Sequence, residues 1–527
     1  MKAIRKLVAF ASAALLLGAC SQETVLTPDE AKQIDPKNNE ISFGTFVGKS
    51  HQTRAISAAV NGGVPGSITS AQALAQHRGF GVFAYYTEDD DYLGTTSVTP
   101  PTAVALTSPQ ASAITPNFMY NQEITGTDAE SPVWTYSPIK YWPNGNATAD
   151  DQDPAATGTP GGKVSFFAYA PFVATTGSTG ITNFSANSAT GNPTITYKID
   201  PSGNVVDLLW GTAGTNGVKA QTGDVVQNGD YIAVDPSGTL AWAERPFPVN
   251  ANLTKMKTTG KVQFVFKHAL AKVGGSSVTT TPATTNGLQI VLDIDKSDGS
   301  ESGGTYDNTE TKVTVQTIDI NVRSKVDANN DGTPDKYLTA AGNQGVLDLA
   351  TGMWTIDKTG SNVTDDLASA STMSHRITSP KSTGTSNATL NTAIAEPASL
   401  ADGGAAWDGL VNGVLTTVQN VYNAETNPLI YIPGTYPELQ IAITYITRTK
   451  DANLAKGYSE VSQTITRTIT FAEAVKLNKQ YSLVIHLGLT SVKFDAIVSD
   501  WDPDIDGDGD VDTSDSNEIH LPINVAP

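Results

Sequence analysis

Short apolar segments, each ended within a few residues by glycine, proline, asparagine, aspartate or serine, recur along most of this 527-residue chain. Many are rich in β-branched and aromatic residues, and several alternate apolar with polar side chains, the pattern of a half-buried antiparallel strand. Helical patterns are short and occur at 70–77 and 471–477. The chain is therefore predicted to be all-β. The clearest predicted strands are 80–86, 164–169, 262–266, 313–322, 430–432, 439–446 and 481–487.

The length is sufficient for two domains of ordinary size. Residues 246–252 interrupt the strand pattern, so we place a boundary near residue 250. One β-sandwich is expected over 55–250 and a second over 251–501. Segments rich in Ser, Thr, Gly and Ala at 173–192, 275–286 and 361–405 are expected to be surface loops or insertions.

Residues 1–20 have the three parts of a bacterial export signal. Basic residues precede the apolar run 7–17, which is too short to span a bilayer because a spanning helix needs about 20 residues. Leu-Leu-Leu-Gly-Ala then leads to Cys20, the only cysteine of the chain. This predicts cleavage after Ala19, acylation of Cys20 by a lipid such as palmitate, and a polar tether to about residue 40. The alternative is an ordinary secretory signal that happens to contain a cysteine.

Composition excludes several classes of protein. The 33 basic and 53 acidic residues give a formal charge of −20, which argues against nucleic acid and anionic lipid surfaces as partners. A single cysteine cannot form an internal disulfide. None of the six histidines begins a His-Glu-x-x-His zinc motif, and no Gly-x-Ser-x-Gly motif is present. The chain is therefore not expected to be an enzyme.

Several segments recur in the same order in a known protein family. The chain resembles the fimbrillins, the type V pilins, over most of its length. The resemblance implies two transthyretin-like β-sandwich domains in tandem, export as an outer-membrane lipoprotein and assembly into fimbriae on the cell surface. His268, Trp134 and Trp142 are expected to be packing residues. The segments that carry the resemblance are 134–143, 166–171, 207–210, 264–272, 352–354 and 481–501.

The segment 40–46 predicts a short strand with one apolar face, because Ile41, Phe43 and Thr45 alternate with polar or small residues. The resemblance implies that an Arg-specific, trypsin-like protease cuts after a following arginine and removes this first strand. We expect the cut between Arg54 and Ala55, which makes 21–54 a propeptide. The next arginine directly precedes the strand predicted from residue 80, a less accessible place. The alternative is that 53–55 is an uncut loop.

The carboxy-terminal segment 517–527 is a candidate donor strand. Burying its four regularly spaced apolar side chains would contribute ~6 to 12 kcal/mol before the costs of ordering and association. Strand donation between subunits is a known recognition mode. Pro522 lacks an N–H group, which suits a strand bonded chiefly on one side there. The alternative is an edge strand that completes its own domain. The four side chains, at period two, are Ile519, Leu521, Ile523 and Val525.

An acidic linker, 502–516, separates this segment from the preceding strands. It carries oxygen donors at positions one, three, five, nine and twelve of a loop with Gly509 at position six, as in an EF-hand-type calcium loop. Position twelve is the shorter Asp, and no paired helices flank the loop. The alternative is a solvated acidic spacer. The expected Ca²⁺ ligands are Asp504, Asp506, Asp508, Asp512 and Asp515, with the backbone carbonyl of Asp510.

A second, weaker calcium candidate lies at 327–335. It has oxygen donors at positions one, three, five and nine, from Asp327, Asn329, Asp331 and Asp335, but Leu338 at position twelve. This is half of a calcium loop. Either ion would stiffen a long loop outside the membrane.

The interpretation that unites these features is a stalk subunit of a surface fimbria. After proteolysis it would polymerise by strand exchange with copies of itself and with other fimbrial subunits. A tip subunit needs no donor strand, which favours the stalk. The alternatives are a tip adhesin or accessory subunit, or a surface lipoprotein that binds a glycan or a host protein.

Overall fold

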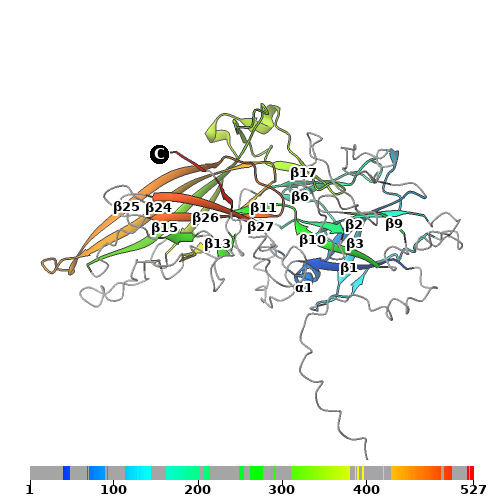
Figure 1. The fold of residues 1–527 in the computed structure, drawn as a ribbon, viewed down its shortest axis with the longest axis horizontal. Coiled ribbons are helices and arrows are strands. Elements are labelled where there is room, and N and C mark those ends of the chain that lie inside the picture. The colour runs from blue at the N-terminus through cyan, green and yellow to red at the C-terminus, as the bar shows by residue number, and fades with distance from the viewer. Residues whose placement is uncertain are drawn as a thin grey trace, which may run out of the picture.

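The full chain is represented by a computed structural model. The structure describes residues 40–47, 68, 70–88, 92, 113–129, 131–143, 162–200, 207–213, 249–254, 261–273, 275–276, 286–287, 289–291, 310–379, 386, 388–390, 394–396, 419–420, 429–487, 492–500, 519–521 and 523–526. Nearly all of the regular secondary structure in these residues is strand, which confirms the all-β class. Figure 1 shows one group of strands at each end of the long axis, with β15, β24 and β25 at one end and β1, β3 and β9 at the other.

The first unit is built on an eight-stranded sheet in which all strands except β9 follow one path. Neighbouring strands along that path are β1 (Ser42–Val47), β10 (Lys261–His268), β8 (Leu209–Ala213), β5 (Val164–Ala170), β2 (Phe80–Tyr86), β3 (Met119–Gly126) and β4 (Trp134–Thr135), and β9 (Asn250–Leu253) pairs with β5.

The central strands β2 and β5 are buried on both faces, which explains why their sequences are continuously apolar rather than alternating. On β2, Val82 belongs to one hydrophobic cluster and Phe83 to another. On β5, Phe166 and Phe167 divide in the same way. The sheet therefore separates two hydrophobic cores.

A four-stranded sheet covers the second of these faces. Ile195 and Leu347 from this sheet pack in one cluster with Phe83, Tyr169 and Trp210 of the large sheet. Two of its strands lie far along the chain from the other two, so the second half of the sequence completes the core of the first unit. The strands in order are β18 (Trp354–Thr355), β17 (Gln344–Asp348), β7 (Thr194–Lys198) and β6 (Gly180–Phe184).

The chain leaves the first unit later than the sequence pattern indicates. Strands β9 and β10 both belong to the first eight-stranded sheet, so the boundary predicted near residue 250 falls inside that unit. The change of sheet comes at Ala269 and Leu270, between β10 and β11 (Ala271–Val273). The interruption at 246–252 thus overlaps β9, a strand of the same sheet, and a gap in the pattern alone does not identify a domain boundary.

The second unit contains two large sheets around one hydrophobic core. The seven-stranded sheet comprises β22 (Gln419–Asn420), β14 (Gln289–Val291), β26 (Lys479–Leu487), β11, β23 (Leu429–Tyr431), β27 (Val492–Asp500) and β28 (Ile519–Leu521). The eight-stranded sheet comprises β19 (Val363–Thr364), β16 (Lys336–Leu338), β15 (Thr311–Val326), β24 (Tyr436–Lys450), β25 (Tyr458–Phe471), β29 (Ile523–Ala526), β20 (Met373–Thr378) and β21 (Ala388–Thr389). A small ladder joins β12 (Gly275–Ser276) to β13 (Asn286–Gly287).

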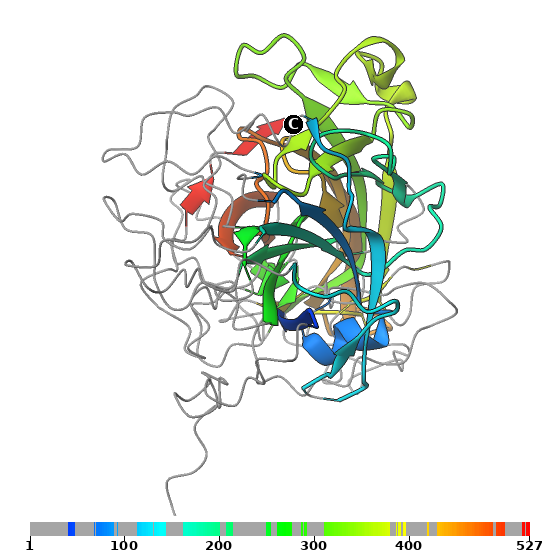
Figure 2. The same ribbon diagram turned by 90° about the vertical axis from the view of Figure 1, so that its right-hand side faces the viewer.

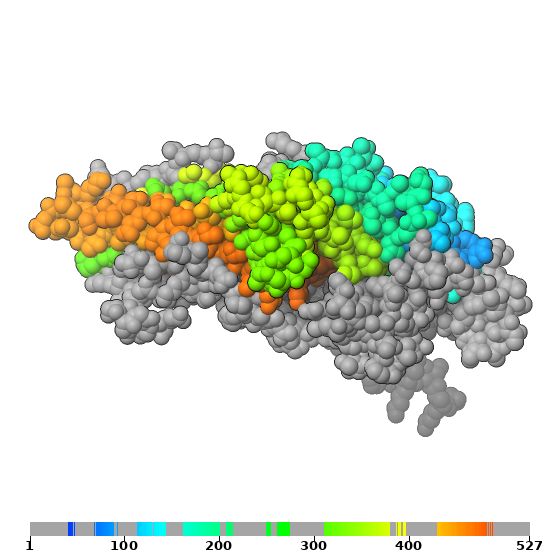
Figure 3. Space-filling model, turned by 90° about the horizontal axis from the view of Figure 1, so that it is seen from above, coloured from blue at the N-terminus to red at the C-terminus, as the bar shows by residue number. Residues whose placement is uncertain are grey.

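Period-two alternation builds the core of this second unit. Ile318 and Ile320 of β15, Ile441 and Ile443 of β24, and Leu483 of β26 all point into it. The long hairpin of β24 and β25 keeps polar residues on its other face, and Figure 3 shows its orange surface forming one end of the molecule.

Of the two predicted helices, one is present. Helix α1 (Ala71–Gln76) begins after Ser70, whose side chain accepts the N–H group of Ala73 at 3.1 Å as an N-cap. The prediction at 471–477 is wrong, because the N–H group of Val475 donates to the carbonyl of Thr435 instead of closing a helical turn. Two short 3₁₀ segments, Gly360–Asn362 and Leu367–Ser369, lie in the second half of the chain.

None of the helices in the described ranges is both long enough and apolar enough to cross a membrane.

A buried ion-pair network lies in the second unit, near the first residues of β15. Arg448 is 1% exposed, and its guanidinium donates to Glu396 at 2.6 Å, to Glu460 at 2.7 Å and to the hydroxyl of Thr314 at 3.1 Å. Glu396 is fully buried. Removing one partner of such a pair leaves a charge in a medium that solvates it poorly.

Replacing Glu396 tests the strength of this network. Glu396→Ala should lower the free energy of unfolding by about 3 to 5 kcal/mol, because Arg448 loses its most buried partner. Urea unfolding measures the change. The matched control is Asp365→Ala, which breaks the exposed Lys336 pair at 2.6 Å and should leave the unfolding midpoint almost unchanged. Equal effects of the two substitutions would contradict this account.

His375 makes the same unit sensitive to acid. It lies on β20 opposite Ile320 of β15, and burial lowers its pKa from 6.5 to about 4. Between these values the unfolded chain binds a proton that the folded protein does not. This contribution to stability is therefore complete above pH 6.5 and decreases as the pH falls toward 4.

His375→Gln should remove this pH dependence. In the native protein the group adds a slope of at most about 1.4 kcal/mol per pH unit to the free energy of unfolding between pH 6.5 and 4. Denaturant unfolding across this range should give a shallower slope for the variant, whereas the slopes of variant and native protein should agree from pH 7 to 8. Unchanged slopes below pH 6.5 would exclude His375 as the cause.

Candidate functional site at the first and last strands

The strand predicted at 40–46 is present as β1, at the edge of the first sheet. It runs parallel to β10, from Ser42 opposite Lys261 to Val47 opposite Phe266. On its other side, the N–H group of Ile41 donates to the carbonyl of Lys140 at 2.9 Å. The sheet thus curls until the segment after β4 meets the start of β1, and β10 is the one described strand that pairs with β1 along its whole length (Figure 1).

The inward face of β1 packs against aromatic rings of the first core, including those of Tyr136 and Phe166; this place is called the aromatic slot below. Ile41, Phe43 and Val47 are 2%, 3% and 4% exposed and belong to the first hydrophobic core. The Phe43 ring centroid lies 5.4 Å from that of Tyr136 and 6.0 Å from that of Phe166. Such aromatic pairs contribute about 0.5 to 1.5 kcal/mol each beyond burial. Phe43 is therefore the main anchor of the strand.

Thr45 is the weak position on the same face. By period two it points inward with Phe43. Its hydroxyl is buried, and no hydrogen-bond partner for it exists among the described residues. A buried, unpaired hydroxyl costs roughly 1 to 3 kcal/mol. The strand therefore combines a strong anchor with an uncompensated polar group two residues away.

The predicted packing tryptophans line the same core. Trp142 is buried and lies 5.7 Å from the Phe166 ring, and Trp134 lies 5.0 Å from the Phe80 ring, centroid to centroid. The Tyr136 hydroxyl donates to the carbonyl of Ile41 at 2.9 Å. These contacts connect the segment 134–142 to β1 and its core.

The carboxy-terminal segment lies on its own second unit in this structure. Strand β28 pairs antiparallel with β27, and β29 pairs antiparallel with β25. The segment expected as one continuous strand is therefore two short strands in different sheets, seen as separate red arrows in Figure 2. Ile519 and Leu521 lie on one, and Ile523 and Val525 on the other. Donation to a neighbouring subunit stays a prediction.

The loop of the second calcium candidate is closed by its own backbone. The carboxylate of Asp327 accepts the N–H groups of Asp331 at 3.1 Å and Gly332 at 2.9 Å, and Asp335 accepts that of Ala328 at 2.7 Å. Each of these oxygens accepts one N–H group and keeps a further lone pair, so the bonds order the loop without excluding a cation.

Two further hydrogen bonds order this loop. The ammonium of Lys358 donates to the carbonyl of Asp327 at 2.9 Å, and the Asn329 amide donates to Asp331 at 3.0 Å. Leu338, at position twelve, is buried in β16. Within the described residues, no group of three or more His, Cys, Asp or Glu side chains is arranged to hold a metal ion. Calcium binding by this loop stays a prediction.

The other predicted sites lie outside the described residues. They are the lipidation site Cys20, the cleavage site at Arg54 and Ala55, and the acidic loop of Asp504, Asp506, Asp508, Asp510, Asp512 and Asp515. Calcium binding by the acidic loop stays a prediction.

The motif segments also meet where the chain passes between the units. The indole N–H of Trp210 donates to the carbonyl of Leu349 at 2.9 Å, and that of Trp354 donates to the carbonyl of Ala269 at 2.8 Å. Gly352 has φ +71°, and a Cβ there would lie 2.4 Å from the Trp210 ring. Glycine is therefore required by both backbone conformation and space.

His268 is more than the packing residue expected from the sequence. Its Nδ1 lies 3.0 Å from Oδ2 of buried Asp207, and the same oxygen accepts the N–H group of Ile68 at 2.7 Å. The backbone N–H of His268 donates to Asn478 at 3.2 Å. The bond to Asn478 connects the end of β10 in the first unit to the residues just before β26 in the second. Both residues stand in the motif segments, but nothing in the sequence pairs them.

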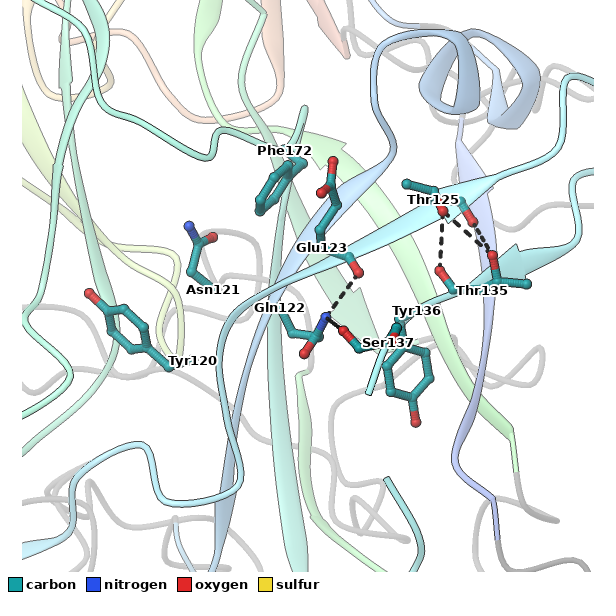
Figure 4. A pocket seen from close by; sticks show the side chains of 9 residues that line it. All are labelled: Tyr120, Asn121, Gln122, Glu123, Thr125, Thr135, Tyr136, Ser137 and Phe172. Carbon is teal, nitrogen blue, oxygen red and sulfur yellow. Dashed lines mark hydrogen bonds between the residues drawn. The ribbon is translucent and has the colours of Figure 1, made fainter. Parts of the chain in front are cut away.

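An open hollow of about 520 Å³ lies beside β3. Figure 4 shows the amide of Gln122 between the carbonyls of Glu123 and Ser137, to which it donates at 3.3 and 3.1 Å. Asn121 accepts from Tyr169 at 2.6 Å and donates to Val173 at 3.0 Å. Because these polar groups bond within the protein, the hollow supports no particular ligand chemistry.

No family model matches the chain. It is 29% identical over 199 residues to the fimbrium subunit Fim1C of Phocaeicola vulgatus, a match that covers 37% of this chain. The matched part spans 39% of the length of that relative. A crystal structure of a fimbrial protein from Bacteroides vulgatus is similar with a TM-score of 0.47 and 17% identity, over 88% of this chain and 100% of that one.

Both of these proteins are fimbrial by name. The match to a fimbrium subunit over part of the chain agrees with the resemblance to the fimbrillins in the ordered sequence motifs.

Proposed function

We propose that this protein is a stalk subunit of a bacterial surface fimbria. It is exported as a lipoprotein, held at the outer membrane through Cys20, and cut after Arg54 by an Arg-specific protease. Loss of β1 opens the aromatic slot of the first unit, and the segment 517–527 of a neighbouring subunit enters it. The resulting chain of subunits is the fimbrial shaft.

The position of β1 is the observation that carries this proposal. The strand is outermost in its sheet, and it precedes the proposed cut. Its removal would withdraw Ile41, Phe43 and Val47 from the core, side chains whose burial contributes about 1.5 to 3 kcal/mol each. An emptied slot lined by aromatic rings would be strongly hydrophobic, so a replacement strand would bind to it.

The carboxy-terminal strands are suited to leave their place. Each is the outermost described strand of its sheet, β28 beside β27 and β29 beside β25. Departure would break one ladder of three paired residues and one of four, without separating two interior strands. Both the removable strand and the donor belong to one chain, which favours a stalk subunit over a tip subunit.

The test uses the full chain, treated with an Arg-specific protease. The cut protein should form polymers, seen by size exclusion and electron microscopy, and amino-terminal sequencing should find Ala55 at the start of its subunits. Deletion of 517–527 should give a folded protein that is cut but remains monomeric. Arg54→Ala should remain uncut and monomeric.

The matched control is Arg78→Ala, at an exposed arginine paired with Glu123 at 2.9 Å. It should be cut and polymerise as the native protein does. Polymerisation of the deletion variant at the native rate, or a cut native protein that stays monomeric at high concentration, would exclude the proposal.

A further inference from the structure

The outgoing strand and the expected incoming segment have the same spacing of inward positions. In β1 and the residue before it, Ile41, Phe43 and Val47 are buried, and Thr45, partly exposed but with a buried hydroxyl, shares their face by period two. In the carboxy-terminal segment they are Ile519, Leu521, Ile523 and Val525. Three of the four inward positions are apolar in both. The difference in polarity is at Thr45, where the incoming strand has an aliphatic residue.

This difference holds for either direction of the incoming strand. If it runs parallel to β1, Ile523 takes the place of Thr45, and if it runs antiparallel, Leu521 does. Thr45 is the position whose buried hydroxyl has no partner among the described residues. An aliphatic side chain there has no polar group to leave unpaired.

The centre of the alignment is also the same in both directions, with Pro522 at the place of Gly44. A Cβ at Gly44 would lie 2.2 Å from Oε1 of Gln263 and 2.8 Å from Cε of Lys261. These are the far ends of flexible side chains on β10, so they can move aside. Gly44 is thus covered in the structure by groups that can yield to a proline ring.

Phe43 opposes the exchange, because neither Leu521 nor Ile523 replaces an aromatic ring fully. The Phe43 ring lies within 6.1 Å of the rings of Phe80 and Phe264, centroid to centroid. Phe43 therefore favours retention of β1 in the slot, whereas the unpaired hydroxyl of Thr45 favours its release. The balance between them sets how readily β1 leaves once its covalent link is cut.

We propose that Thr45 makes β1 the weaker occupant of the slot and so biases exchange toward the incoming strand. The inference rests on the proposed function, and it identifies the residue that discriminates the outgoing from the incoming strand. A strand with an aliphatic residue at the position of Thr45 stays in the slot, and a strand with a hydroxyl at that position leaves it more readily.

The experiment follows release of the cut fragment from the full chain after Arg-specific proteolysis, by mass spectrometry of the retained protein. Thr45→Val should slow release by about tenfold, a factor that corresponds to about 1.4 kcal/mol. Thr45→Ser, which keeps the hydroxyl, should release its fragment at the native rate or faster. In the uncut protein, Thr45→Val should also raise the melting midpoint, and Thr45→Ser should not.

Equal release rates for Thr45→Val and the native protein, or an unchanged melting midpoint in Thr45→Val, would overturn the inference. A synthetic peptide of residues 517–527, added after release, tests the proposed function separately. If the emptied native protein does not bind the peptide, strand donation from this end fails, whatever the release rates. If it binds, Ile523→Thr and Leu521→Thr peptides should bind at least tenfold more weakly than a His520→Ala control, and equal binding would count against the inference.

Discussion

Burial of both faces of β2 and β5 is the constraint on which the first unit depends. A sheet whose central strands have no solvent-facing side is stable only when two further layers cover it. One layer is formed by the curl of the sheet itself, which brings β1 and the segment around Trp142 over Phe166. The other is the four-stranded sheet, to which β17 and β18 come from the far side of the unit junction. The two units are therefore interlocked and do not simply follow each other.

Much of the local structure could be predicted from the sequence. Alternation along β15 and β24 and the N-cap at Ser70 depend only on neighbours a few residues away. Such features can therefore be predicted directly from the sequence. The boundary near residue 250 and the membership of β17 in the first unit depend on pairings between distant segments. Local patterning contains no information on such pairings, and β10 has the same alternation whichever sheet it joins.

For the candidate site too, some features could be predicted from local sequence and others could not. The alternation at 41–45 predicts a strand with one apolar face, and β1 has that face in the core. Which rings surround Phe43, and that the hydroxyl of Thr45 is left unpaired, depend on side chains from β2, β5 and β10. The second calcium candidate, at 327–335, shows a further limit of sequence reading. Its carboxylate spacing suggests a cation, but the spacing does not predict that Asp327 also accepts the backbone N–H groups of Asp331 and Gly332.

The parallel pairing of β1 with β10 has a consequence for the order of folding. Ser42 is paired with Lys261, so the two strands that meet are separated by most of the first unit. During synthesis, the amino-terminal strand emerges first but has no partner until the segment 261–268 has followed it. Contacts of such long sequence separation form late, because the intervening loop must be closed before they contribute stability. The first unit is therefore completed only by later parts of the chain, by β10 on the side of β1 and by β17 and β18 on its other face.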